Sequence, residues 1–380
     1  MSEHRRFDRS QIEFEPLSQR ENRVRIVETA IDPDTAARAL DGSRARTADK
    51  IVDAIRAARD AERPVVLAFG AHTIKNGAGL ILRRLIEGGW VTHLATNGAG
   101  IIHDWEFAYQ GESSEDVREN VETGRFGIWE ETGLYLNLAI AVGAFEGLGY
   151  GESVGAFIEA GSLRIPSEEE LESFATSGDE IPARRAAAID LLAVLDERRL
   201  GADRRRTLLD SLDGDRRLAV EHPFRRYSVQ AAAFRTRVPC TAHPMFGHDI
   251  IYTHPANHGA AVGRAAERDF LTYAAAISRL SGGVYLSVGS AVMSPMIFEK
   301  SLSMARNLAR QRGDSIDSHT ICVVDLAEST WDWQRDGEPP PNNPAYYLRF
   351  MKTFNRMGGT LRYVSCDNRD FLLHLLSRLS

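Results

Sequence analysis

The sequence predicts an α/β fold with a doubly wound parallel sheet, and three observations support this prediction. Six short apolar runs alternate with segments in which apolar residues recur at helical spacing. Several of the runs lead directly into Gly, Asn or Asp, as buried strands do where the chain leaves a sheet. Strands and helices alternate at the spacing of βαβ units, in which the strands are parallel.

The apolar runs give the predicted strands, and the periodic segments around them give the predicted helices. The predicted strands are 64–70, 90–96, 238–242, 283–288, 320–324 and 360–364. The predicted helices are 34–59, 74–87, one from Ile101, 134–148, 267–280, 296–311, 346–357 and 370–379. We therefore predict a Rossmann-like sheet with helices on both of its faces.

Residues 1–380 are predicted to form a single α/β nucleotide-binding domain with two additions. Residues 1–30 lack a periodic pattern and are expected to form an N-terminal arm. Residues from about 150 to 225 are rich in Glu, Arg, Asp and Ala, and are expected to form a helical insertion on the surface. A polar, proline-rich loop over 330–343 carries Trp331, Asp332 and Trp333, a combination that can bind a cationic amine or simply be solvated.

The composition is that of a soluble globular protein, with 380 residues, 43% hydrophobic and 26% charged. A net charge of −7 provides no basic field that would attract nucleic acid or an anionic membrane. No apolar run reaches the roughly 18–20 residues of a membrane span, and the charged N-terminus does not resemble a secretory signal. Three cysteines, far apart and odd in number, indicate a reducing compartment, so we expect a cytoplasmic protein.

Ligands of open parallel sheets bind beyond the carboxyl ends of the strands, and these ends hold most of the candidate residues. The turn Asn97–Gly100 can bring backbone N–H groups to a phosphate or a cofactor ring, or can be a tight turn without a ligand. It lacks the G-x-G-x-x-G pattern of dinucleotide sites. The candidates at strand ends are His72, Lys75, Asn76, Asn97, Gly98, Ala99, Gly100, His103, Asp104, His248, Asp249, Gly289, Ser290 and Asp325. Of these, Lys75 can contribute to an anion site or simply be solvated, and we expect it to be solvated.

The segment 241–258 holds four of the eleven histidines. It can be interpreted as a metal site, as an active-site loop that uses His and Asp for acid–base work, or as a polar loop with incidental histidines. Its spacings match no standard metal signature, and no G-x-S-x-G, Walker A, H-E-x-x-H or C-x-x-C pattern occurs in the chain. Among its residues, His248 and Asp249 are our acid–base candidates.

Lysine is scarce, since only four of the 46 basic residues are lysines. Lysine can lose its proton and act as a nucleophile, which arginine cannot. Lys352 lies beside an apolar stripe of the predicted helix 346–357. Its stem can cover that stripe while the charge reaches solvent, or the amine can be desolvated and suited to imine chemistry.

Five segments follow one another in an order and spacing that point to a known family. They are 67–77 (LAFGAHTIKNG), 90–104 (WVTHLATNGAGIIHD), 238–254 (VPCTAHPMFGHDIIYTH), 282–292 (GGVYLSVGSAV) with a helix ending in MARN, and 324–328 (VDLAE). This ordered set resembles deoxyhypusine synthase over roughly residues 50–110 and 230–380. The chain differs from that family between residues 111 and 229.

The resemblance implies an NAD-binding fold and a homo-oligomer, a tetramer or dimer, with sites at subunit interfaces. It also implies an enzyme that oxidises an amine with NAD and transfers a group through a lysine imine. The positions that match cofactor contacts are His72, Asn76, Asn97, Gly98, Ala99, His103, Asp104, Gly289, Ser290 and Asp325; Asp249 matches an amine-binding position and Lys352 the imine-forming lysine.

The chain departs from the family at positions that carry its chemistry. Ser294 and Pro295 stand where the family has tandem histidines, and Ile102 and His103 where it has tandem glutamates. We therefore expect a divergent relative that is not a true deoxyhypusine synthase. The expected function is an NAD-binding transferase or oxidoreductase of a small amine or polar metabolite, with Lys352, His248, Asp249 and His103 as catalytic candidates. Two alternatives stay open: a non-redox transferase or hydrolase of a nucleotide or sugar phosphate, with or without a metal, and a non-catalytic ligand-binding protein.

Overall fold

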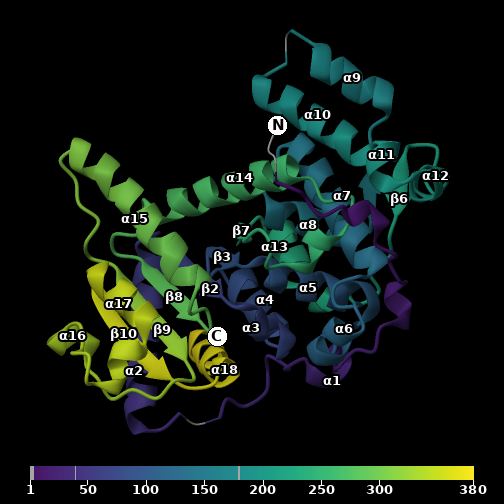
Figure 1. Cartoon of the computed structure of the whole chain (residues 1–380). Coiled ribbons are helices and arrows are strands. Elements are labelled where there is room, and N and C mark those ends of the chain that lie inside the picture. The colour runs from purple at the N-terminus through teal and green to yellow at the C-terminus, as the bar shows by residue number, and fades with distance from the viewer. Residues whose placement is uncertain (1–3, 39, 179) are drawn as a thin grey trace.

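A six-stranded parallel sheet lies at the centre of the protein, in a computed structural model that describes residues 4–38, 40–178 and 180–380 (Figure 1). Its strands are β2 (Val65–Phe69), β3 (His93–Thr96), β7 (Cys240–Ala242), β8 (Val284–Val288), β9 (Thr320–Asp325) and β10 (Thr360–Ser365). The order across the sheet is β10-β9-β8-β2-β3-β7, and every neighbouring pair is parallel. All six predicted strands are confirmed, with ends that differ by at most three residues.

The strand order places a topological switch point between β2 and β8. The chain runs outward from β2 to β3 and β7, and then crosses to the opposite side of β2 to form β8, β9 and β10. Sheets wound in this way bind ligands in the crevice at the carboxyl ends of the two strands where the winding reverses. Here Gly70 follows β2 and Gly289 follows β8, and a Cβ on Gly70 would overlap the carbonyl oxygen of Gly289. Glycine is therefore required at residue 70 by the close approach of the two strand ends.

Helices cover both faces of the sheet, which confirms the doubly wound prediction. On one face lie α2 (Gly42–Asp60), α4 (Gly79–Glu87) and α18 (Asn368–Leu379), which bury Val65, Leu67 and Phe69 of β2. The other face holds α14 (Gly259–Ile277), α15 (Met293–Gln311) and α17 (Arg349–Arg356), which bury Val66 and Ala68. Successive residues of one strand thus enter different cores, as a strand buried on both faces requires.

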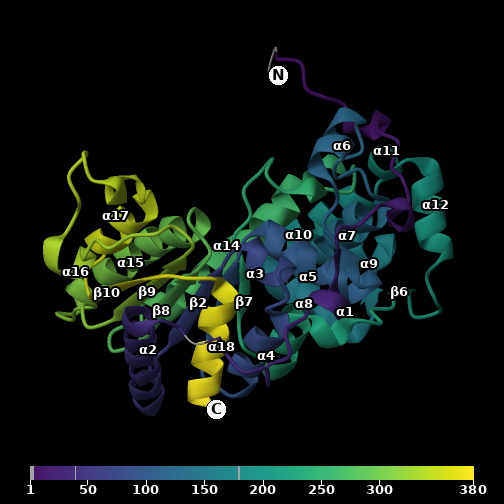
Figure 2. The same cartoon turned by 90° about the horizontal axis from the view of Figure 1, so that it is seen from below.

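A group of helices extends the protein beyond β7, on the side away from β10 (Figures 1 and 2). It comprises α5 (Gly98–Gln110), α6 (Val117–Glu122), α7 (Glu130–Glu146), α8 (Tyr150–Ala160), α9 (Glu168–Thr176), α10 (Pro182–Leu195), α11 (Glu197–Leu200), α12 (Ala202–Asp210) and α13 (Val229–Thr236). All of these helices except α6, which buries no residue, contribute to a third apolar core, with Tyr150 and Phe157 of α8 inside it. The segment 150–225 holds α8 to α12 and the antiparallel pair β5 (Ser162–Arg164) and β6 (Arg217–Ala219).

Several predicted elements differ from those observed. The helix predicted over 34–59 begins at Gly42, and the helix predicted over 267–280 begins at Gly259. The predicted helix 74–87 is divided into α3 (Ala71–Lys75) and α4, because Gly77 has a φ of +84° and a Cβ there would overlap the carbonyl oxygen of Thr29. The predicted loop 330–343 contains one short helix, α16 (Trp333–Asp336). The N-terminal segment contains α1 (Ile26–Thr29) and β1 (Val24–Arg25), which pairs with β4 (Glu112–Ser113). In the described part of the chain, no helix is long and apolar enough to cross a membrane.

Candidate functional site

A pocket of about 190 Å³ lies beyond the carboxyl end of β3, where α5 begins. We call it the α5 pocket. It brings together five residues that the sequence marks as candidates: Lys75, Ala99, His103, His248 and Asp249. Its other lining residues are Arg20, Ile102, Glu106, Ser114, Glu115, Val117, Phe126 and Ile250. Residues from the N-terminal arm, from α3 and α5, and from the histidine-rich loop therefore meet at one place.

Asp249 lies against the first turn of α5. A Cβ on Gly98 would overlap its carboxylate, so glycine at residue 98 is what allows the carboxylate to approach the helix. The Oδ2 atom of Asp249 is buried and has no hydrogen-bond partner among the described residues. Burial raises the pKa of Asp249 to about 6, while the charge of His248, the Tyr252 side chain and the Ala99 N–H oppose the rise. The pocket thus contains a carboxyl group whose pKa lies close to neutral pH and one of whose oxygens is buried against the first turn of α5.

His103 is held at the end of a chain of hydrogen bonds. Its Nδ1 atom is 2.7 Å from the Ser113 hydroxyl, which donates a hydrogen bond of 2.6 Å to Oε2 of Glu106. The hydroxyl has one proton, and that proton is committed to the Glu106 carboxylate. The Ser113 oxygen must therefore accept from His103, which places the imidazole proton on Nδ1 and leaves Nε2 as an acceptor.

Burial lowers the pKa of His103 to about 4. The negative charge of Glu106 opposes this effect, and the positive charges of Lys75 and Arg20 add to it. The ring is consequently neutral near pH 7, with a lone pair on Nε2. Such a nitrogen can accept a hydrogen bond from a bound ligand, but its low pKa makes it a weaker base than Asp249.

An ion pair between Arg20, in the N-terminal arm, and Glu106 holds the Glu106 carboxylate in place. Arg20 contacts Glu106 through two hydrogen bonds of 2.7 and 2.8 Å, and both side chains are 1% exposed. Glu106 also accepts a hydrogen bond of 3.0 Å from Thr132. Burial alone would raise the pKa of Glu106, but the Arg20 guanidinium lowers it below its ordinary value. Glu106 is thus a fixed anion on which the position of Ser113 depends.

The sequence analysis did not identify Arg20, Glu106 or Ser113 as site residues. One signal was present, because Glu106 follows His103 by three residues and so lies on the same face of α5. Arg20 is 86 residues away from Glu106 in the sequence, and nothing in the local pattern relates the two.

Two candidates in and after the turn Asn97–Gly100 have roles inside the protein. The Asn97 side chain accepts a hydrogen bond of 2.9 Å from the Gly100 N–H and so caps α5. Asp104 is 2% exposed and accepts from the backbone N–H groups of Val229 and Gln230 at 3.0 and 3.1 Å, which caps α13. The Asp104 carboxylate therefore stabilises the helix packing and is not presented to a ligand.

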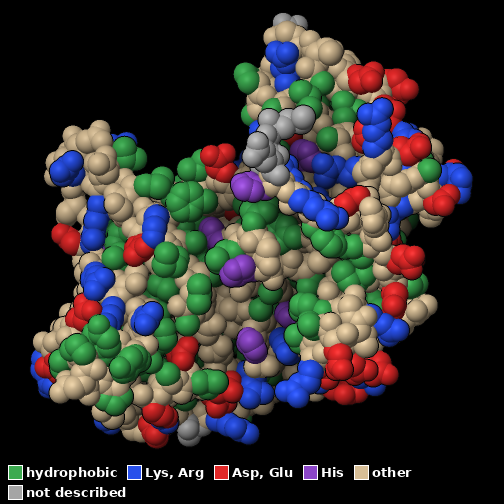
Figure 3. Space-filling model, in the orientation of Figure 1, with side chains coloured by type: hydrophobic (Ala, Val, Ile, Leu, Met, Phe, Trp, Pro, Cys, Tyr) green, Lys and Arg blue, Asp and Glu red, His purple; other side chains and the backbone are tan. Residues whose placement is uncertain are grey.

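The remaining cofactor candidates lie at the ends of β2, β8 and β9. His72 is exposed in α3 and Asn76 ends that helix. Gly289 has a φ of +59°, and the Ser290 hydroxyl accepts a hydrogen bond of 3.2 Å from the Ser294 N–H. Asp325 ends β9 and accepts a hydrogen bond of 3.0 Å from the N–H of Ala327. Figure 3 shows histidine side chains along the middle of this face of the molecule.

The four histidines of the segment 241–258 point to different surroundings. His243 is buried and contacts the Thr241 hydroxyl at 3.0 Å, and His254 lies 3.5 Å from Glu130. His258 caps α14, whereas His248 is exposed at the α5 pocket. Within the described residues, no group of three or more His, Cys, Asp or Glu side chains is placed to hold a metal ion.

Lys352 lies apart from the lining of the α5 pocket. Its Nζ atom is 3.3 Å from Oε1 of Glu338 and 2.9 Å from the centre of the Tyr346 ring, and its side chain is 13% exposed. The ammonium is thus held by an ion pair and a cation–π contact. The Lys352 amine is therefore largely buried and is paired with Glu338, a contact that neither of the two sequence-based alternatives for Lys352 includes.

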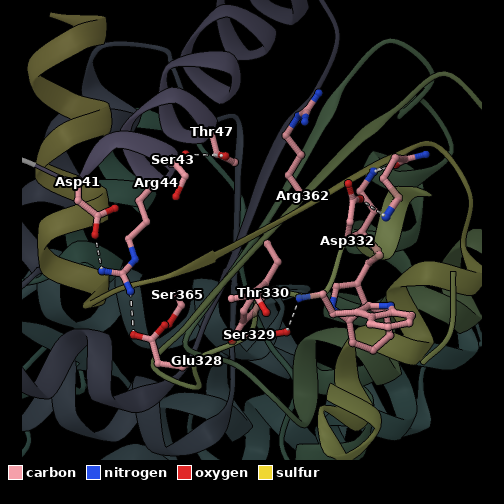
Figure 4. Close-up of a pocket in the computed structure, with 15 residues that line it drawn as sticks. Asp41, Ser43, Arg44, Thr47, Glu328, Ser329, Thr330, Asp332, Arg362 and Ser365 are labelled. Carbon is pink, nitrogen blue, oxygen red and sulfur yellow. Dashed lines mark hydrogen bonds and ion pairs between the residues drawn. The ribbon is translucent and has the colours of Figure 1, made fainter. Parts of the chain in front are cut away.

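A second cavity, of about 510 Å³, lies between the start of α2, the segment 328–334 and β10 (Figure 4). Arg44 extends between Asp41 and Glu328, with contacts of 3.1 and 2.8 Å, and Arg362 extends from β10. Trp331, Asp332 and Trp333 also line this cavity. None of the candidate residues at the strand ends lines this cavity.

Comparisons with known proteins give no family assignment. No protein family model matches the chain, and no curated protein matches its sequence. Among solved structures, unliganded AgrE matches with 15% identity and a TM-score of 0.43, and the arginine dihydrolase ArgZ of the ornithine–ammonia cycle in Cyanobacteria with 13% and 0.41. A LOR/SDH protein from Methanococcus maripaludis S2 matches with 11% identity and a TM-score of 0.40.

The three matches cover most of this chain, but they cover only about a third of AgrE and of ArgZ. They cover 90% of this chain against 34% of AgrE and 32% of ArgZ, and 91% against 70% of the LOR/SDH protein. The chain therefore spans about a third of the length of AgrE and ArgZ. Because the three TM-scores are below 0.5, the fold class of this chain follows from its own strand order.

Proposed function

We propose that the protein is an NAD-dependent enzyme that oxidises a small amine, with its chemistry in the α5 pocket. The observation that carries this proposal is the pairing of His103 with Asp249 in one pocket at the carboxyl edge of the sheet. Their surroundings move the two pKa values to about 4 and about 6, so that near pH 7 a neutral base lies beside a carboxylate. Two groups whose pKa values are separated by their environments are typical of acid–base sites.

The two groups have complementary tasks in this proposal. An ammonium carries no lone pair to assist the loss of hydride, so a base must first remove a proton from it. Nε2 of His103 accepts a hydrogen bond from the ammonium and so orients it, and the Asp249 carboxylate, whose pKa of about 6 is closer to neutral pH, accepts the proton. Bound NAD supplies the hydride acceptor.

The residues at the strand ends fit NAD in one orientation. The Asp249 carboxylate lies over the first turn of α5, so a negatively charged phosphate would be repelled there. The unpartnered Oδ2 of Asp249 instead suits a cationic nicotinamide ring close by. We assign the phosphates to the crevice between β2 and β8, near His72, Asn76, Gly289 and Ser290.

This assignment predicts that NAD binds and that a negative charge at residue 72 weakens its binding. His72→Glu places a carboxylate near the pyrophosphate, and we expect the Kd for NAD to rise about tenfold, or roughly 1.4 kcal/mol. Isothermal titration calorimetry measures the change. Gln311→Glu adds the same charge at an exposed residue near the end of α15 and is expected to leave the Kd unchanged. A folded wild-type protein that does not bind NAD would contradict the cofactor assignment.

The imine role that the family resemblance implies for Lys352 is a separate proposal. Lys352→Arg keeps the positive charge opposite Glu338 but removes the nucleophilic amine. In the presence of NAD, which oxidises the amine substrate to an imine that Lys352 can take over with release of ammonia or an amine, we expect this variant to lose trapping by borohydride, while its melting temperature stays within about 2 °C of the wild type. Mass spectrometry of the reduced protein detects the adduct. An adduct that persists in Lys352→Arg would exclude Lys352 as the site.

A further inference from the structure

We infer that the ligand of the α5 pocket is a small aliphatic amino acid, bound as a zwitterion with its carboxylate toward Lys75 and its ammonium toward Asp249. This inference takes from the proposed function only the use of the α5 pocket as the substrate site. It goes further by requiring a carboxylate on the amine. It follows from the charges that line the pocket and from the partners that each of them has.

Most of the charge in the pocket is already matched within the protein. Arg20 forms the buried ion pair with Glu106, and its Nη1 is also 4.0 Å from Oε1 of Glu115. Glu115 accepts further hydrogen bonds from Asn120, Trp129 and the N–H of Gly127, at 2.6, 3.0 and 3.2 Å. Arg20, Glu106 and Glu115 are therefore already paired within the protein and do not require a ligand.

Lys75 and Asp249 are the charged groups left over. Lys75 lies at the end of α3, half-buried, and forms no hydrogen bond or ion pair with a described residue. Asp249 has a buried oxygen without a partner, and its side chain lines the same pocket. No ion pair within 4 Å joins the two among the described residues. Both line a single pocket, one positive and one negative, and neither forms an ion pair with a described residue.

A zwitterion matches this arrangement better than a singly charged ligand. A simple amine would satisfy Asp249 and leave the Lys75 ammonium partly desolvated without a partner, and a simple carboxylate would do the reverse. An apolar part of the wall is formed by Ile102, Val117, Phe126 and Ile250, whereas His103, His248 and Ser114 are polar members of the lining. Together with a volume of about 190 Å³, this wall fits a short aliphatic side chain.

Three matched ligands test the inference without an activity assay. L-Norvaline carries both charges, n-butylamine is norvaline without the carboxylate, and pentanoate is norvaline without the amine. Calorimetric titration of the full chain at pH 7.5, without and with NAD, gives the three dissociation constants. We expect norvaline to bind at least about tenfold more tightly than either of the others, because each lost charge removes a charge-assisted hydrogen bond.

Two variants assign the two charges to their residues. In Lys75→Gln, norvaline is expected to bind no more tightly than butylamine does, while the affinity for butylamine stays that of the wild type. In Asp249→Asn, norvaline is expected to lose its advantage over pentanoate. Lys50→Gln makes the same substitution at an exposed lysine of α2 and should leave all three constants unchanged.

The outcomes separate this inference from the proposed function. If butylamine binds the wild type as tightly as norvaline does, the carboxylate contact with Lys75 is refuted, while an NAD-dependent amine enzyme stands. If norvaline is preferred but Lys75→Gln retains the preference, the assignment to Lys75 is refuted. If none of the three binds, with or without NAD, the inference fails whatever the NAD titration gives.

Discussion

Replacing Arg20 with alanine is expected to lower the free energy of unfolding by about 3–5 kcal/mol. The substitution leaves Glu106 charged, 1% exposed and without its guanidinium partner. A buried carboxylate that loses its counter-ion is left desolvated without compensation. The resulting loss of stability is larger than the net stabilisation that the ion pair provides. Urea denaturation followed by circular dichroism measures the change.

Arg164→Ala provides the matched control. Arg164 and Glu170 also form two hydrogen bonds, of 3.1 and 2.8 Å, but their side chains are 44% and 32% exposed. Water can solvate the carboxylate left behind, so we expect a loss below about 1 kcal/mol. Equal losses in the two variants would mean that burial does not set the strength of the Arg20 contact.

The arm that carries Arg20 illustrates the limit of local sequence patterns. The strands could be predicted because each one is a short apolar run, and its two faces enter the two cores that cover the sheet. The strand-end rule also brought Lys75, Ala99, His103, His248 and Asp249 into one set, and the structure joins these five at the α5 pocket. Each of these predictions needs only the period of a local segment and the direction of the strands.

Contacts between distant segments could not be read in this way. The break between α3 and α4 depends on Thr29, which lies against Gly77, although the apolar pattern runs through the break. Asp104 has the residue type of a ligand-binding group, yet it caps α13 because Ser228 and the N–H groups after it reach its carboxylate. The residue type and its place at a strand end therefore do not show whether the polar atoms of a side chain are already hydrogen-bonded within the protein.

Lys352 and the histidine-rich segment show the same distinction. The scarcity of lysine singles out Lys352, but its contacts with Glu338 and Tyr346 come from the fold of 338–352 and not from the helix pattern. The four histidines of 241–258 are close in sequence and yet face four different surroundings. Relationship to deoxyhypusine synthase, a cytoplasmic location and a homo-oligomeric state stay predictions from the sequence.

His103→Ala is expected to reduce the rate of NAD reduction by about 10²-fold, because the variant loses the Nε2 atom that orients the amine, and misplaced reactants cost factors of that size. Since His103 is half-buried, we expect the variant to stay folded. The absorbance of NADH at saturating amine and NAD measures the rate, and thermal unfolding checks the fold. A variant with the wild-type rate would show that His103 does not position the amine.

The tautomer of His103 can be tested without turnover. Two-bond nitrogen–proton correlation spectra of ¹⁵N-histidine protein are expected to show a protonated Nδ1 and an unprotonated Nε2. Because burial lowers the pKa of His103 to about 4, this pattern should persist unchanged from pH 6 to pH 8. A protonated Nε2 in the wild type would contradict the hydrogen-bond chain.

Ser113→Ala removes the group that fixes the tautomer and leaves the imidazole in place. We expect the Nε2–H form to become populated and the rate to fall, whereas Ser113→Thr keeps a hydroxyl at the same position and should restore both. A structural role of Ser113 alone would lower the melting temperature without changing the nitrogen pattern. If Ser113→Ala retains the Nδ1–H form, the tautomer is set by the surroundings of the ring and not by Glu106 acting through Ser113.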